Sequence, residues 1–272
     1  MRSVILLIAL AATLAAPAWG QRRRGSSRAF DHTEGNVSYT GRFTFVRIRY
    51  QDGIGGGFSF RRDPGWAHDY PRAERNFTRM LDELTNLDPL IDDSNILTLD
   101  DPELFRYPIA YLSEPGYWHM SDEEVEGLRT YLLKGGFLIV DDFRGGREWS
   151  QFASQMRRAF PAGQLVEMRE DHPIFDAFFH ITFDSVRNPN FDVVPAFYGL
   201  YEENDPNKRL MVIVNYNNDI GDYWEWSDAG WLPIELSAPG TTLDVEALDG
   251  SRWPARSAAI PFLDPRKDIP KQ

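Results

Sequence analysis

Residues 107–143 decide the fold of this chain, and they read YPIAYLSEPGYWHMSDEEVEGLRTYLLKGGFLIVDDF. The apolar run Ile109–Leu112 is typical of a strand, and Phe137–Val140 is typical of a strand covered on both faces. Between the two runs, Ser121 and Glu124 predict a capping box, in which each side chain satisfies a free amide of the first helical turn. The helix that follows has one apolar face, formed by Val125, Leu128 and Leu132.

A strand, a helix and a buried strand at this spacing imply a right-handed crossover between two parallel strands. Open sheets built from such units bind ligands at the carboxyl ends of their strands. We therefore expect candidate ligand-binding residues at those ends. In the central stretch and the residue after it, the residues at these strand ends are Ser113, Glu114, Asp141, Asp142 and Arg144.

The flanking sequence extends the same alternation of strands and helices. Gly41–Tyr50 and Ile96–Leu99 are strand-like, and an amphipathic helix that begins near Pro71 connects them. After the central stretch, Glu148–Phe160 predicts another helix and Gln164–Met168 a further strand. The predicted fold class is α/β, a three-layer sandwich with a mainly parallel sheet and helices on both faces.

The later part of the chain changes character. Val193–Glu202 and Arg209–Tyr216 flank a short polar loop with Asn, Asp and Pro, which predicts a late antiparallel hairpin. From about Ser237 onward prolines recur and periodicity disappears. We expect an α/β domain over residues 41–236 and a Pro-containing tail over 237–272, loosely packed or disordered.

Three further residues are candidates for the same rim of the sheet. His68 and Asp69 precede the first helix, where they form either a cap with a surface histidine or a pocket wall with a titratable group. His172 precedes a proline and is either a turn residue or a member of this rim. The glycine-rich segment 53–57 lacks the spacing of a dinucleotide-binding loop, so we predict a flexible loop first and a ligand loop second.

Familiar catalytic motifs do not occur in the sequence. There is no G-x-S-x-G nucleophile elbow, no Walker phosphate loop and no H-E-x-x-H zinc motif. The absence of cysteine excludes disulfides, thiolate metal sites and a cysteine nucleophile. From these motifs we assign no catalytic residue, no metal site and no cofactor.

Carboxylates are the remaining candidates for binding or catalytic chemistry in this sequence. Asp141 and Asp142 at one strand end, with Glu114 at its neighbour, are suited to bind a hard cation through oxygen ligands. They are also suited to act as acid and base on a glycan, which requires two carboxylates across one bond. The alternative is structural, because adjacent aspartates often cap the helix that follows.

The N-terminus predicts export. Arg2 precedes an apolar core, Val4–Leu14, and small residues follow it, so we expect a cleaved signal peptide over residues 1–20 and a basic linker over 21–40. The expected location is periplasmic or secreted, with no membrane span in the mature chain. A net charge of −12 argues against nucleic acid as the main partner.

Several segments resemble the bacterial domain-of-unknown-function family 4159, which looks like the class I glutamine amidotransferases in fold. The matching segments are GRFTFVRIRY, WAHDYPRAERNF, MSDEEVEGLRTYLLKGGFLIVDDF, DHPIF and YNNDIGDYWEW. The resemblance implies a flavodoxin-like sandwich and, by association, envelope partners in systems with MoxR-type ATPases and von Willebrand A domains. Glutaminase chemistry does not carry over, because its cysteine is absent.

The leading functional hypothesis is an exported, non-catalytic binding or envelope-assembly module. The alternative is a carboxylate- or cation-assisted hydrolase that acts on envelope glycan or peptide. A hydrolase requires Glu114 and either Asp141 or Asp142 to converge on an open cleft with perturbed ionisation.

Overall fold

The computed structural model of the 272-residue chain describes residues 35–52, 64–177 and 180–228. The predicted signal peptide (1–20), the glycine-rich segment (53–57) and the predicted tail (237–272) lie outside these residues, as do positions 21–34 of the predicted linker. Within the described ranges, no helix combines the length and the apolar character that crossing a membrane requires.

A seven-stranded sheet forms the centre of the described part, in the order β3-β1-β4-β6-β9-β8-β7. Its strands are β1 (Phe43–Ile48), β3 (Pro89–Leu97), β4 (Ile109–Ser113), β6 (Phe137–Phe143), β7 (Leu165–Glu167), β8 (Ala196–Tyr201) and β9 (Leu210–Tyr216). The short strands β2 (Gln51–Asp52) and β5 (Trp118–His119) pair separately. The helices are α1 (Arg72–Leu84), α2 (Asp122–Leu133), α3 (Gly145–Ala159) and α4 (Ile220–Glu225).

The sheet topology confirms the predicted α/β fold. Strands β3, β1, β4, β6 and β9 pair in parallel, and β8 and β7 add antiparallel pairings at one edge. The parallel strands follow the 2-1-3-4-5 order of flavodoxin-like sheets, in which ligands bind near the point where the strand order reverses. Here that point lies between the carboxyl ends of β1 and β4.

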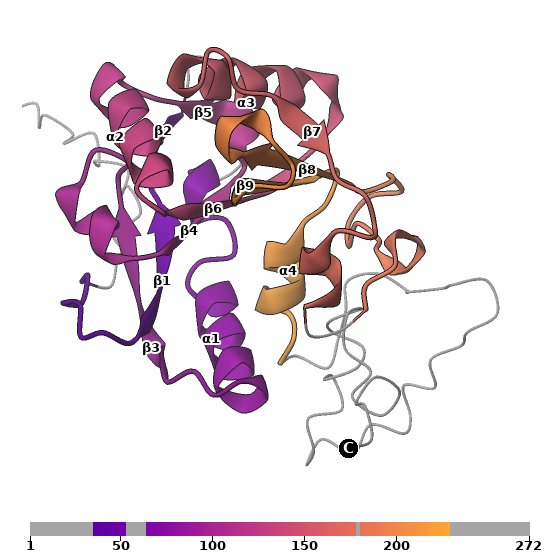
Figure 1. The fold of residues 1–272 in the computed structure, drawn as a ribbon. Coiled ribbons are helices and arrows are strands. Elements are labelled where there is room, and N and C mark those ends of the chain that lie inside the picture. The colour runs from indigo at the N-terminus through magenta and orange to yellow at the C-terminus, as the bar shows by residue number, and fades with distance from the viewer. Residues whose placement is uncertain (1–34, 53–63, 178–179, 229–272) are drawn as a thin grey trace, which may run out of the picture. The chain divides into compact units, whose positions relative to one another are not determined.

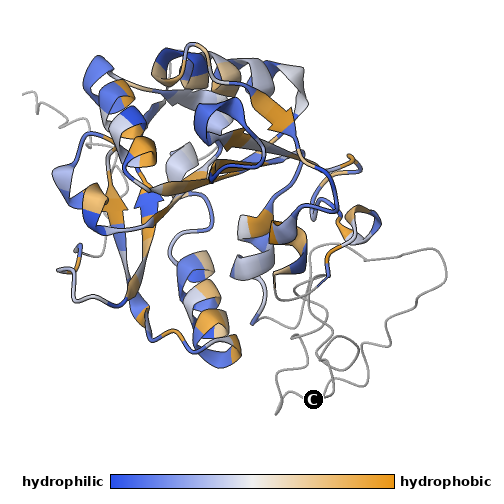
Figure 2. Ribbon diagram, viewed as in Figure 1, coloured by the Kyte–Doolittle hydropathy of each residue, from blue (hydrophilic) through white to orange (hydrophobic). Residues whose placement is uncertain are grey.

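Helices cover both faces of the sheet. Figure 1 shows α2 and α3 on one side and α1 and α4 on the other. Figure 2 shows hydrophobic residues concentrated on the central strands, while the helices carry both hydrophobic and hydrophilic residues. On the α1 and α4 side, Phe45, Tyr111 and Trp224 form one buried cluster with residues of α1. This cluster seats α4 against the sheet close to the strand ends.

The central stretch folds as predicted. The side chain of Ser121 accepts a hydrogen bond from the Glu124 amide (3.1 Å), and the Glu124 carboxylate accepts one from the Ser121 amide (2.8 Å), which confirms the capping box. Strand β6 differs from the expectation because it continues through Asp141 and Asp142 to Phe143. The acidic pair therefore belongs to the last residues of the strand.

Helix α4 is an element that the sequence patterns did not predict. The side chain of Asp219 accepts a hydrogen bond from the Asp222 amide (3.0 Å) and caps its first turn. The helix spans only Ile220–Glu225, too short for a clear 3.6-residue periodicity. Its position beside β6 places its acidic residues near the strand ends.

Candidate functional site

Acidic residues from four separate segments meet at the carboxyl edge of the sheet. Ser113 at the end of β4 pairs with Asp141 of β6, so these two strands end at the same level. Residue 114 follows β4, the loop before α1 supplies His68 and Asp69, and α4 with its cap supplies further carboxylates. The parallel arrangement of the strands thus collects side chains that are distant in sequence.

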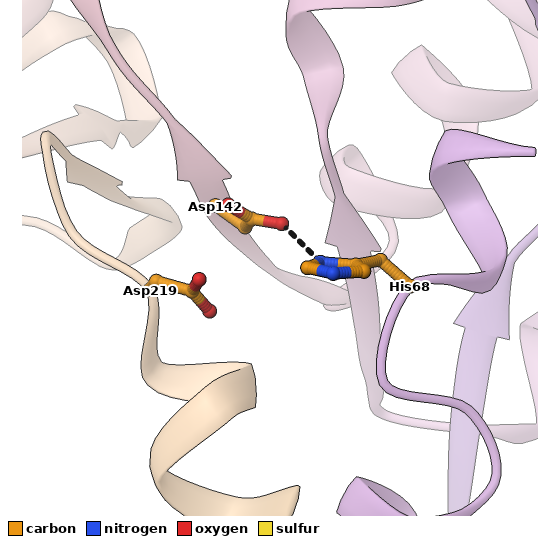
Figure 3. Close-up of side chains that lie close together, drawn as sticks. All are labelled: His68, Asp142 and Asp219. Carbon is orange, nitrogen blue, oxygen red and sulfur yellow. Dashed lines mark hydrogen bonds and ion pairs between the residues drawn. The ribbon is translucent and has the colours of Figure 1, made fainter. Parts of the chain in front are cut away.

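His68 lies among three of these carboxylates. Its Nδ1 is 2.7 Å from Oδ2 of Asp142, 3.4 Å from Oδ1 of Asp69 and 3.7 Å from Oε1 of Glu114. Figure 3 shows the side chains of His68, Asp142 and Asp219 turned toward one common space, with the hydrogen bond between His68 and Asp142 dashed. One ligand atom from each of these three residues lies within 4.8 Å of the other two.

A buried arginine holds the loop that carries His68. The Arg47 guanidinium donates hydrogen bonds to the carbonyl oxygens of Trp66 (2.9 Å) and His68 (2.8 Å), and it pairs with the carboxylate of Glu74 on α1. Arg47 is fully buried. Glu74 compensates the charge of Arg47, and the hydrogen bonds of Arg47 fix the backbone of the loop. The imidazole of His68 is therefore available for contact with the carboxylates.

A second group of possible ligands lies directly beside the first. Ligand atoms of Asp69, Asp222 and Glu225 lie within 4.8 Å of one another. The Asp69 side chain is only 1% exposed, and neither of its oxygens accepts a hydrogen bond from the described residues. Gly221 allows this carboxylate to approach α4, since a side chain at that position would collide with Oδ2 of Asp69.

Asn190 connects the two groups. Its side-chain amide donates a hydrogen bond to Oδ2 of Asp219 at 3.2 Å and another to Oδ2 of Asp222. Because one amide spans one carboxylate of each group, the two groups form a continuous polar cluster.

Asp141 has a different role from its neighbour. Its Oδ2 accepts hydrogen bonds from the amides of Ile220 (2.8 Å) and Gly221 (3.0 Å) and from the Tyr111 hydroxyl (2.9 Å). These bonds attach the first turn of α4 to the end of β6. Asp141 therefore acts on a helix start, as the structural alternative proposed, but that helix is α4 rather than the helix that follows in sequence.

The electrostatics of the cluster favour a bound cation. Burial raises the pKa values of Asp69 and Asp219 well above their ordinary range, and neighbouring aspartates raise them further. Burial also raises the pKa of Asp141 to about 7, an effect that the charge of Asp142 reinforces. Carboxylates buried together destabilise their ionised forms unless a positive charge compensates them.

His68 supplies part of this compensation when it is protonated. Burial alone would lower the pKa of its imidazole, but the hydrogen bond to Asp142 and the charges of Asp69, Asp142 and Glu114 outweigh burial and raise the pKa to about 10. The cluster thus stabilises one positive charge at the position of the imidazole.

Three of the acidic residues also adopt an unusual backbone conformation. The φ angles of Asp69, Glu114 and Asp142 are 65°, 46° and 56°, in the left-handed region that residues with side chains seldom occupy. Such conformations cost about 1–3 kcal/mol each and are concentrated at functional sites. Here they turn the chain at the strand and loop ends.

The structure brings together five of the eight sequence-predicted site residues: His68, Asp69, Glu114, Asp141 and Asp142. Ser113 is buried at the end of β4, where its carbonyl accepts a hydrogen bond from the Tyr50 hydroxyl (3.0 Å). Arg144 lies over the ring of Phe191, with its guanidinium carbon 3.5 Å from the ring centroid.

His172 has separate surroundings. Its Nδ1 accepts a hydrogen bond from the Ile174 amide (3.2 Å), and its ring packs near the rings of Phe175 and Tyr201. These contacts match the turn interpretation of this histidine.

Sequence reasoning missed Asp219, Asp222 and Glu225. All three belong to α4 or its cap. An aspartate followed three residues later by another, directly after the apolar strand β9, is a helix-start pattern that would have indicated the element. The meeting of α4 with the loop before α1 has no comparable sequence pattern.

Comparison with known families finds a match for most of the chain. The family model described as a domain of unknown function (DUF4159) matches residues 44–242. A search of the curated proteins finds no match.

Proposed function

The chain belongs to the family described as a domain of unknown function (DUF4159), and we propose from its site that it is a binding module that holds a divalent cation. One observation carries the proposal. His68, Asp142 and Asp219 come from three separate segments, yet their ligand atoms lie within 4.8 Å of one another in an acidic, largely buried cluster.

The ligand set favours a particular class of cation. One imidazole nitrogen with two carboxylate oxygens suits first-row divalent ions such as Mn²⁺ and Zn²⁺ better than the all-oxygen preference of Ca²⁺. The His68 side chain is 31% exposed, whereas the Asp142 side chain is 7% exposed. Solvent therefore reaches the cluster from the histidine side.

Titration of the purified protein with Mn²⁺ or Zn²⁺ tests this proposal. After treatment with a chelator, we expect calorimetric binding and a higher melting temperature, because an ion that binds only the folded state adds about 2.7 kcal/mol at a concentration a hundredfold above its Kd. Asp142→Asn should reduce both effects, because it removes one ligand of this ion. The matched control is Asp93→Asn, which changes an exposed aspartate of β3 and should retain both.

Two results would contradict the proposal. Absence of binding by the wild-type protein to either ion would remove it directly. Equal binding by Asp142→Asn and wild type would show that any bound ion lies elsewhere on this acidic chain.

Cation-assisted hydrolysis of envelope glycan or peptide is the second candidate function. It is favoured by the carboxylates of Glu114 and Asp142, which both lie within 3.7 Å of Nδ1 of His68 and so converge. An ion held there would lower the pKa of a bound water, as hydrolytic metal sites require. Incubation of the Mn²⁺-loaded protein with cell-wall fragments, with Asp142→Asn as control, tests for cleavage products.

The proposed setting is the cell envelope. It is supported by the apolar N-terminal segment with small residues near position 20 and, for MoxR-type and von Willebrand A partners, by family resemblance alone. The likeness to amidotransferases also stays a proposal, supported by the flavodoxin-like strand order. Fractionation of cells, with N-terminal sequencing of the mature chain, tests the export prediction.

A further inference from the structure

A second group of carboxylates lies beside the proposed ion and is not among its ligands. Asp69, Asp222 and Glu225 offer three oxygen ligands within 4.8 Å of one another. From these residues we infer a second cation position, so that the protein holds two neighbouring divalent ions. The inference rests on the proposed function, because the second ion is placed beside the first.

The state of Asp69 is the observation that points to a ligand. Its side chain is 1% exposed, and both of its oxygens lack a hydrogen-bond donor among the described residues. A buried carboxylate usually has such donors, since each unmade bond leaves a desolvated oxygen uncompensated. One of its oxygens instead lies within 4.8 Å of a carboxylate oxygen of Asp222 and of Glu225. A cation bound there would supply the missing partner of Asp69 and would also contact the other two carboxylates.

The local structure is shaped to admit this carboxylate. At Gly221, on the first turn of α4, a side chain would collide with Oδ2 of Asp69 and lie 2.8 Å from the Tyr111 hydroxyl. Glycine at this position therefore lets Asp69 approach α4. Asp141 holds the same turn in place through the amides of residues 220 and 221.

The two positions are neighbours and differ in ligand chemistry. Nδ1 of His68 in the first group lies 3.4 Å from Oδ1 of Asp69 in the second, and Asn190 donates to a carboxylate of each. The first position has a nitrogen ligand, whereas the second offers oxygens alone. All-oxygen sets suit hard cations such as Mg²⁺, Ca²⁺ and Mn²⁺. Mn²⁺ is therefore the ion expected to occupy both.

Equilibrium dialysis and electron paramagnetic resonance with Mn²⁺ on the full chain test the inference. We expect two bound ions per chain, with a spectrum broadened by coupling between them. Glu225→Gln should bind one ion and give the spectrum of an isolated Mn²⁺. Excess Mg²⁺ should displace one of the two ions from wild type. The control Glu126→Gln, at an exposed position of α2, should retain both ions and the coupling.

The outcomes separate this inference from the proposed function. A single ion that Asp142→Asn abolishes and Glu225→Gln leaves intact would overturn the second position and keep the first. Two ions in Glu225→Gln would also overturn it. No bound ion in wild type would overturn both statements. Asp69→Asn serves as a second variant if Glu225→Gln fails to fold, and circular dichroism of each variant checks the fold.

Discussion

At the scale of single residues, Asp141 and Asp142 show how neighbouring identical side chains take different roles. In β6 successive side chains point to opposite faces, and the left-handed backbone at Asp142 turns the chain further. Asp141 accepts three hydrogen bonds that attach α4, while Asp142 binds His68. The first aspartate therefore positions an element, and the second belongs to the candidate ligand set.

The pH dependence of stability should separate these roles for Asp141. Its pKa of about 7 in the folded protein exceeds the ordinary value of 3.8, so the folded state holds the proton more tightly and stability falls as pH rises through this range. Asp141→Asn should lose this component and gain stability over wild type at pH 8 relative to pH 4, by up to about 4 kcal/mol. Urea unfolding in the presence of a chelator measures the difference.

The variant Asp141→Ala provides the comparison. It removes the titrating carboxyl as well as the acceptor of the Ile220 and Gly221 amides. It should therefore share the loss of the pH slope and be less stable than Asp141→Asn by about 1–3 kcal/mol at both pH values. If Asp141→Asn shows the same pH slope as wild type, the raised pKa is wrong.

A second residue-scale prediction concerns His68. In the cation-free protein we expect its imidazole to titrate near pH 10, followed by nuclear magnetic resonance. Asp142→Asn removes the closest charged partner, and the pKa of His68 should fall by about 1–3 pH units. Titration of wild-type His68 near its ordinary value of 6.5 would show that the carboxylates do not enclose it as described.

At the scale of elements, the site depends on how α4 is seated. Its apolar residue Trp224 packs with Phe45 and Tyr111, and its amino-terminal turn is bonded to Asp141. The helix is short and would be marginal alone, because a few turns cannot offset the cost of nucleation. Tertiary contacts therefore create the element that carries Asp219 and Asp222.

Gly221→Ala should disturb this seating. The added methyl group would collide with Oδ2 of Asp69 and approach the Tyr111 hydroxyl, so we expect a loss of about 1–3 kcal/mol in stability and weaker Mn²⁺ binding. Gly146→Ala in α3 is the matched control, because nothing lies within 4 Å of the added atom. The control should be neutral or stabilising by up to about 1 kcal/mol. Thermal melts compare the two, and equal melting temperatures would contradict the tight approach.

The elements that could be predicted were those with local signals. The capping box at Ser121 and Glu124 and the apolar run of β6 involve residues close in sequence, so periodicity and cap chemistry identified α2 and the strand. The end of β6 was placed too early because Asp141 and Asp142 are polar but buried. Helix α4 was not predicted, because its sequence signal is a short helix-start pattern that directly follows a strand.

At the scale of the whole molecule, the acidic cluster makes the folded state sensitive to pH. Asp69, Asp141 and Asp219 all have raised pKa values, chiefly because they are buried, and the pKa of His68 is raised to about 10. Each of these groups binds its proton more tightly in the folded than in the unfolded state. Each therefore contributes a loss of stability as pH rises.

The melting temperature should reflect the combined loss of stability from these titrating groups. In chelator we expect it to fall steadily between pH 5 and pH 9. The folded protein keeps the Asp141 proton up to a pKa of about 7 and the His68 proton up to a pKa of about 10, whereas the unfolded chain loses both at lower pH. Saturating Mn²⁺ should remove most of the fall, since the ion replaces the protons as the compensating charge. A chelated protein whose melting temperature rises across this range would contradict the buried carboxylate cluster.

The sequence by itself determined the α/β class, the central strand–helix–strand unit and the edge of the sheet at which the candidate site lies, because these follow from patterns between residues a few positions apart. It also indicated His68, Asp69, Glu114 and Asp142 as candidates. Only the tertiary structure decided that His68 bonds to Asp142, 74 residues away, and that α4 joins them. The reason is physical: strand order and the packing of α4 bring these segments together, and both depend on contacts between residues distant in sequence.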